Sequence, residues 1–175
     1  MKTINIRHTT ILILSMFFFI ACSNDDNHVT AGPVISTNGD AVLYNYRELH
    51  FKDSLTLQII LPSSTDADSD EEQLYIYTGF YNSEGDDQWY PIPGVRTDKD
   101  YQIYREHHKD TLNPNLVNLS IYTKKVTSRE FFGNTLSFDQ LKIVAVNSEA
   151  LRGLTPADLD LKDYQAVMVY FGLDP

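Results

Sequence analysis

The chain has 175 residues, the size of a single domain. Its composition of 42% hydrophobic and 22% charged residues is that of a globular protein with enough apolar side chains for a packed core. The formal net charge of −10 argues against nucleic-acid binding, because nucleic-acid-binding proteins neutralise phosphates with clustered Lys and Arg. With one cysteine, the chain has neither an internal disulfide nor a thiolate metal cage.

The N-terminus has the three-part pattern of a secretory signal. Lys2 and Arg7 precede an apolar run, residues 11–20, that only Ser15 interrupts. As a helix this run would be about 16 Å long, against a hydrocarbon core of about 30 Å. We therefore predict a signal peptide over residues 1–21. The alternative is a buried N-terminal helix, which a run that is apolar on all sides and flanked by cations disfavours.

The run ends in Phe19-Ile20-Ala21-Cys22, which resembles the lipobox of bacterial lipoproteins. The resemblance implies that the sulfur of Cys22 receives a diacylglycerol, that a lipoprotein signal peptidase cuts before this residue, and that the new amine is acylated. Each buried methylene contributes ~0.8 kcal/mol, so two or three acyl chains on one residue anchor stably. We therefore expect the membrane to be a partner, through lipid at Cys22.

The residues after the cysteine indicate where the lipoprotein is sent and predict a tether. Ser23 resembles the enteric signal for the outer membrane, and Asp25-Asp26 resembles the surface-export signal of Bacteroidota lipoproteins. Both also suit an ordinary linker, and the two interpretations stay open. We expect attachment to the cell outer membrane, on its periplasmic or its surface-exposed face. Residues 22–40 are mostly polar, which predicts a lipidated flexible tether. Without residues 1–21 the net charge is −12, which favours a soluble monomer.

Residues 41–175 are predicted to form a mostly β domain, an antiparallel β-sandwich of immunoglobulin-like or similar type. In Leu55–Leu61 every second residue is Leu or Ile, which gives the one strongly apolar face of a half-buried strand. Gln73–Tyr81 has large side chains on both faces, so both faces should be covered. Turn residues separate the strands and no long helical pattern falls between them, which favours antiparallel pairing. Six or seven strands are expected, and the other candidates are Val42–Tyr46, Tyr101–Arg105, Leu116–Thr123 and Leu141–Val146.

The C-terminal residues change to a helical period. We predict a short amphipathic α-helix with Asp160 or Asp163 near its start as a cap and Gly172 just past its end, which covers an open end or edge of the sheet. Its apolar positions are Tyr164, Val167, Met168 and Phe171.

The acidic stretch at residues 66–72, just before the strand predicted at Gln73–Tyr81, is the candidate metal site. Asp66, Asp68 and Asp70 alternate as in the opening of an EF-hand calcium loop. Glu71 then stands where that loop needs Gly, and Tyr77 where it needs a bidentate Glu. We interpret the stretch as a solvated acidic loop. Weak calcium binding is the alternative, and no other metal or cofactor is expected.

Trp89 and Tyr90 are the candidate ligand-binding residues. Trp89 is the only tryptophan, and Pro91 and Pro93 hold the segment rigid. Exposed aromatic rings of this kind stack on sugars or bind partner proteins. The alternative is a tryptophan buried in the core of the sandwich.

No catalytic residue is predicted. The chain has no G-x-S-x-G, no H-E-x-x-H and no glycine-rich phosphate loop. His107-His108 cannot clamp one metal from a strand, because neighbouring residues there point to opposite faces. We expect a protein that is not an enzyme. A hydrolase built on two of the 24 acidic residues is the least favoured alternative.

The segments Gln88–Pro93 and Asp163–Leu173 resemble parts of small uncharacterised envelope lipoproteins of Bacteroidota. That resemblance implies an envelope location and no particular activity. The sequence as a whole predicts a lipid-anchored outer-membrane or cell-surface lipoprotein that acts as a binding module for a glycan or a protein. The alternative is an envelope assembly or adaptor protein without a small-molecule ligand.

Overall fold

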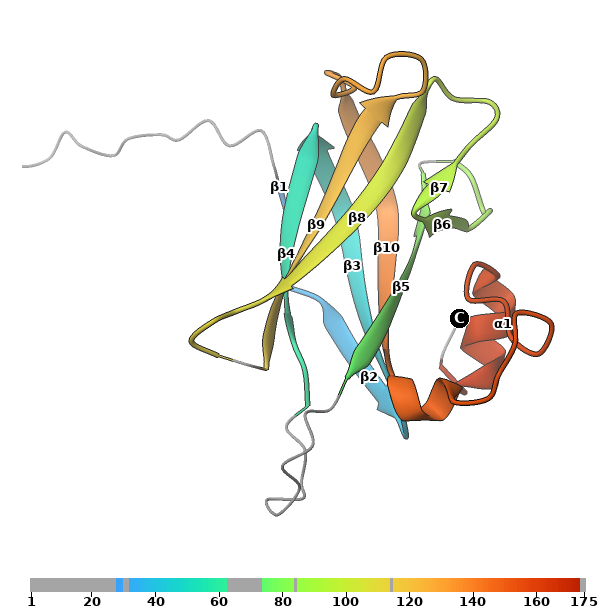
Figure 1. Cartoon of the computed structure of the whole chain (residues 1–175). Helices are drawn as coiled ribbons and strands as arrows, with labels where there is room; N and C mark the ends of the chain where they lie inside the picture. The colour runs from blue at the N-terminus through green and yellow to red at the C-terminus, as the bar shows by residue number, and fades with distance from the viewer. Residues whose placement is uncertain (1–27, 30–31, 63–73, 84, 114, 174–175) are drawn as a thin grey trace, which may run out of the picture.

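The computed structural model describes residues 28–29, 32–62, 74–83, 85–113 and 115–173. This part of the chain is mostly β, with two antiparallel sheets and one short C-terminal α-helix (Figure 1). The predicted β-sandwich is therefore confirmed. The signal peptide, Cys22 and the aspartates Asp66, Asp68 and Asp70 lie outside the described residues.

The first sheet contains β1 (His28–Val29), β2 (Val34–Asn38), β3 (Ala41–Lys52), β5 (Tyr75–Asn82), β6 (Tyr90–Ile92) and β10 (Thr135–Asn147). Its order is β1-β3-β10-β5-β6, with β2 also paired to β3. The second sheet runs β4-β9-β8-β7, from β4 (Ser54–Ile60), β9 (Leu116–Lys125), β8 (Tyr101–Lys109) and β7 (Gly94–Val95). A 3-10 helix, η1 (Ser148–Leu151), and the helix α1 (Tyr164–Tyr170) follow β10.

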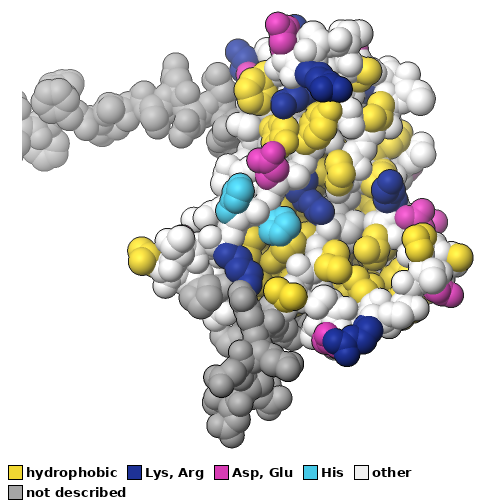
Figure 2. Space-filling model, viewed as in Figure 1, with side chains coloured by type: hydrophobic (Ala, Val, Ile, Leu, Met, Phe, Trp, Pro, Cys, Tyr) yellow, Lys and Arg dark blue, Asp and Glu magenta, His cyan; other side chains and the backbone are white. Residues whose placement is uncertain are grey.

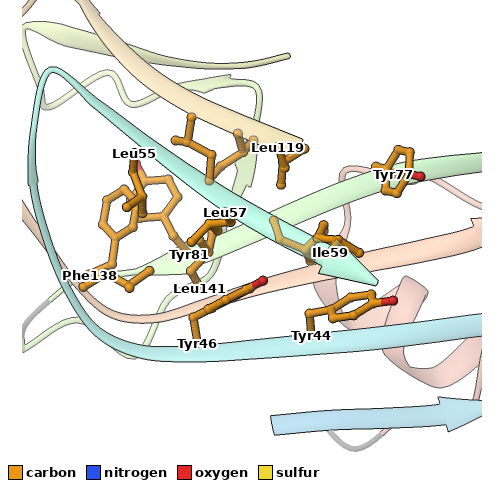
Figure 3. Packing of buried hydrophobic residues seen from close by; sticks show 14 of the residues in the cluster. Tyr44, Tyr46, Leu55, Leu57, Ile59, Tyr77, Tyr81, Leu119, Phe138 and Leu141 are labelled. Atoms are coloured by element: carbon orange, nitrogen blue, oxygen red, sulfur yellow. The ribbon is translucent and has the colours of Figure 1, made fainter. Parts of the chain in front are cut away.

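The main core lies between the two sheets. Along β4 and β9, buried and more exposed residues alternate, and Leu57 pairs with Leu119 on the buried face. Because side chains alternate across a strand, one face of each sheet collects the apolar residues and meets the other sheet. Figure 3 shows residues of both sheets filling this space, including Tyr77, Tyr81 and Phe138 of the first sheet.

The chain passes between the sheets through a tight corner after β6. Ile92 ends β6, the Ile92-Pro93 peptide bond is cis, and Gly94 begins β7 in the other sheet. A side chain at Gly94 would collide with the carbonyl oxygen of Pro91, so the corner requires glycine. Both strands at this corner are short, so they cover only part of the sandwich edge.

The C-terminal segment forms a third layer on the outer face of the first sheet. Val167 and Met168 of α1 are buried with Phe80 and Val144 in a second hydrophobic cluster. The helix was expected over an end or edge of the sheet, and it lies on a face instead (Figure 1). The reason is that β5 and β10 carry apolar side chains on both faces, so each face needs a cover.

The helix itself begins where a cap was predicted. Asp163 is the N-cap, and its carboxylate accepts a hydrogen bond from the backbone N–H of Ala166 at 3.0 Å. Gly172 follows the helix in the left-handed conformation, with a φ of 58°.

The tether predicted over residues 22–40 is wrong for its C-terminal part. Val34–Asn38 forms β2, and His28–Val29 forms β1, both antiparallel to β3. Every residue of β2 is exposed, including Val34 and Ile35. Backbone hydrogen bonds to an otherwise open strand edge hold it there, and composition does not reveal such pairing.

Candidate functional site

A hollow opens on the outer face of the first sheet, between the loop before β6 and the start of α1. Its volume is about 420 Å³. That size falls within the roughly 300–1,000 Å³ of small-molecule sites. The lining combines aromatic, acidic, basic and amide side chains: Trp89, Asp160, Lys162, Asp163, Tyr164 and Gln165.

Two aromatic rings form one wall of the hollow. Trp89 stacks on Tyr164 with ring centroids 4.4 Å apart and planes 14° from parallel. Tyr164 in turn packs edge-on against the buried Phe80 at 5.5 Å. Burial raises the pKa of Tyr164 to about 12, so its phenol stays protonated at neutral pH. Packing thus fixes both rings before any ligand arrives.

A buried lysine supports this aromatic pair. Lys142 projects from β10 to the outer face and is 3% exposed. Its Nζ donates a hydrogen bond to the Tyr164 hydroxyl at 2.6 Å and lies 4.7 Å from the centre of a Trp89 ring. Such a cation attracts the electron-rich face of an aromatic ring, so Lys142 holds the pair in place.

The geometry leaves one face of the indole clear of both groups. The Lys142 ammonium is close to the Tyr164 hydroxyl but 5.1 Å from the ring centre, so it lies beyond the hydroxyl and near the plane of the ring. Because the Tyr164 ring is nearly parallel to the indole, tyrosine and lysine lie on the same side of Trp89. Neither group covers the opposite face.

The acidic residues of the hollow are positioned by the backbone of the same segment. Asp163 Oδ1 accepts from the N–H of Ala166, and Asp160 Oδ1 accepts from the N–H of Lys162 at 2.9 Å. Each carboxylate keeps Oδ2 as an acceptor. The lining therefore offers two oriented carboxylates as hydrogen-bond acceptors, and Gln165 adds an amide that both donates and accepts.

The two residues predicted as a ligand-binding pair face opposite sides of the first sheet. Tyr90 lies 5.5 Å from Tyr81 of the main core, whereas Trp89 packs against the second cluster. The ring of Tyr90 is covered by Arg96, 3.9 Å from its centre, and its hydroxyl donates to Asp86 at 2.7 Å. Tyr90 is therefore a packing residue on the side of the main core, and the ring that stacks on Trp89 is that of Tyr164.

Sequence reasoning missed Lys142 and the role of Tyr164. Lys142 stands in an apolar strand, where a lysine is expected to point to solvent. Tyr164 was assigned to the apolar face of the helix, which is where it lies, but nothing in the sequence links it to Trp89. One signal was present. Lys142 stands between Leu141 and Ile143 in a run of apolar residues, and both faces of this strand proved to be covered.

A second half-buried aromatic pair lies on the other side of the molecule. Tyr104 and Tyr122 are cross-strand neighbours on the outer face of the second sheet, 5.4 Å apart and 8° from parallel. Their hydroxyls donate to Gln102 and Glu106. This pair serves below as a matched control for Trp89.

The histidines do not form a metal site in the described part of the chain. His107 pairs with the buried Leu119 and faces inward, whereas His108 pairs with Asn118 and faces outward, as the strand pattern predicted. Among the described residues, no group of three or more His, Cys, Asp or Glu side chains could hold a metal ion.

Comparison with known proteins yields no match with a protein-family model, a curated protein or a solved structure. Within the described residues, every helix is too short or too polar to span a membrane.

Proposed function

We propose that this protein is a lipid-anchored lipoprotein of the cell outer membrane that binds a glycan without catalysis, in the hollow beside Trp89 and Tyr164. The observation that carries the proposal is the stacked aromatic pair, fixed by Lys142, on the rim of a hollow of about 420 Å³.

The chemistry of the lining suits a sugar ring. The C–H face of a pyranose packs on an aromatic face, and its hydroxyls need hydrogen-bond partners around the rim. The indole supplies the aromatic face. The carboxylates of Asp160 and Asp163 and the amide of Gln165 supply the hydrogen-bond partners. Two carboxylates in the hollow and a net charge of −10 disfavour an acidic ligand there. We therefore expect a neutral oligosaccharide.

Binding is tested with the full chain and a panel of neutral and acidic oligosaccharides, followed by calorimetry on the best ligand. Trp89→Ala should weaken binding by about 5-fold to 150-fold, because stacking of a ring on an aromatic side chain is worth on the order of 1–3 kcal/mol. Tyr104→Ala removes a half-buried ring on the outer face of the second sheet and should leave affinity unchanged. Equal affinity in Trp89→Ala, or loss only in Tyr104→Ala, would refute this site.

The anchor is tested separately. Membrane attachment is supported by the lipobox resemblance at Cys22. Cys22→Ser removes the sulfur that accepts the lipid. When it is expressed in bacteria that lipidate their lipoproteins, the variant should move from the membrane fraction to the supernatant. A variant that still pellets with membranes contradicts the anchor, and it leaves the sugar-binding proposal to be judged on its own measurement.

An adaptor that binds another envelope protein is the second candidate. Val169 and Tyr170 of α1 are 69% and 49% exposed, and they lie on the same short helix as Tyr164. Exposed apolar side chains next to a hollow are a feature of protein interfaces. A photo-crosslinker at Val169 should trap one dominant envelope protein if this function holds, whereas one at Ile60 of the second sheet should not.

A further inference from the structure

An arginine and a histidine lie on the inner face of the second sheet, near its edge. On β8, Arg105 pairs with Ile121 of β9, and His107 pairs with Leu119. Both partners are fully buried in the main core. Directly paired residues of an antiparallel ladder lie on the same face, so Arg105 and His107 lie on the face of β8 that is turned toward the first sheet. Arg105 is half-buried there, and His107 is exposed.

The edge of the sandwich beside these residues has no covering strand in the described part of the chain. β6 pairs only with Gly79–Tyr81 of β5, and β7 pairs only with Gln102 and Ile103 of β8. The first half of β5 and the second half of β8 therefore face each other across an open edge. Figure 2 shows histidine and basic side chains next to hydrophobic ones on the face that carries these strands.

Arg105 is half-buried there, and one nitrogen of its guanidinium is a buried, unsatisfied donor. Its Nη1 atom is inaccessible to solvent and has no hydrogen-bond partner among the described residues. Burial lowers the pKa of Arg105, yet an arginine remains cationic in a protein. A buried cationic donor without an acceptor is costly, and most such groups in folded proteins are paired.

Two further donors surround the same space. The ring of His107 lies 4.9 Å from the ring of Tyr77, which projects inward from the opposite sheet and is 5% exposed. Burial is the main cause that lowers the pKa of His107, and the nearby Arg105 adds to it. An arriving anion would face a guanidinium, an imidazole and a phenol, which all donate hydrogen bonds.

We propose that Arg105, His107 and Tyr77 form a binding site for an oxyanion group, entered at the open edge between β5 and β8. A planar guanidinium matches a carboxylate or sulfate with two parallel hydrogen bonds. The acidic chain repels anions at long range, so the site recognises its ligand by local geometry. It is separate from the hollow at Trp89 and does not rest on the function proposed for that hollow.

Two probes separate the sources of such an oxyanion. Sodium sulfate supplies a free inorganic ion, and sodium glucuronate supplies a carboxylate on a sugar, each added to the full chain at constant ionic strength with chloride. The imidazole NMR signals of His107 should shift with saturation for at least one probe, while those of His50 stay fixed. A response to sulfate alone assigns a free ion, and a response to glucuronate alone assigns a sugar acid. No saturable shift with either probe overturns the proposal.

Substitution of Arg105 tests the same site by stability. Arg105→Met removes a half-buried charge with an unsatisfied donor, so the variant should resist urea at least as well as the parent. It should also bind the effective probe at least tenfold more weakly. Arg47→Met, at an exposed position of β3, should leave binding unchanged. Binding equal to the parent in Arg105→Met overturns the proposal. If Arg105→Met does not fold, Arg105→Lys keeps the charge and loses the two-point geometry, and the same loss of binding is expected.

Discussion

The contact between Lys142 and Tyr164 gives the most quantitative test of the candidate site. Tyr164→Phe deletes only the hydroxyl that accepts the Lys142 hydrogen bond at 2.6 Å and keeps the ring stacked on Trp89. A hydrogen bond to a charged group is worth about 1.5–3 kcal/mol. The free energy of unfolding should therefore fall by about 2 kcal/mol.

Urea denaturation measures this change. With an m-value of about 2 kcal/mol/M, a loss of about 2 kcal/mol lowers the midpoint by roughly 1 M. Tyr170→Phe is the matched control, because Tyr170 lies on the same helix and is 49% exposed. It should change the free energy of unfolding by less than about 0.5 kcal/mol.

A double-mutant cycle with Lys142→Met isolates the contact. In that background the ammonium is gone, so Tyr164→Phe should cost much less than in the parent. The reasoning is refuted if Tyr164→Phe behaves like Tyr170→Phe, or if its cost is the same whether or not Lys142 is present.

Three further predictions concern the fold. Leu119→Ala, at a fully buried position of β9, should cost about 2–5 kcal/mol in urea denaturation, whereas Ile60→Ala, at a 66% exposed position, should cost little. Asp163→Ala removes the N-cap of α1 and should cost about 0.5–2 kcal/mol in the same assay, while Asp163→Asn should cost much less. Hydrogen bonds from Tyr90 and the backbone of Gln88 lower the pKa of Asp86 below its ordinary 3.8, so its contribution to stability is present above that value and is lost as pH falls further. Asp86→Asn should reduce this acid-dependent loss in denaturation measured from neutral to acidic pH.

Each of these has an outcome that contradicts it. Equal costs at Leu119 and Ile60 would mean that the two sheets do not pack as described. If Asp163→Ala leaves the free energy of unfolding unchanged, Asp163 does not stabilise α1 as an N-cap. An unchanged pH dependence in Asp86→Asn would mean that other carboxylates carry the acid loss.

The strand pattern of the core was readable from sequence for a physical reason. Leu55, Leu57 and Ile59 alternate with polar residues because one face of β4 meets the core and the other meets water. The helix was readable in the same way from its apolar spacing and its Asp163 cap. Local patterns of this kind depend only on which side of an element is buried.

The misjudged features depend on contacts between distant segments. β2 exposes all its side chains, so only its pairing with β3 makes it a strand. The position of α1 on a sheet face follows from the doubly apolar strands that it covers. Trp89, Lys142 and Tyr164 come from a loop, a strand and a helix that are far apart in the sequence, and no spacing connects them. The candidate site could therefore be predicted only at Trp89.

The fluorescence of the single tryptophan tests the central claim most directly, because every change in its emission reports on Trp89. The full chain is titrated with the oligosaccharide that binds best, and calorimetry is run in parallel. Saturable emission changes with the same dissociation constant as the heat signal are the expected result. Tight binding by calorimetry with unchanged tryptophan emission would show that the sugar binds elsewhere on the molecule.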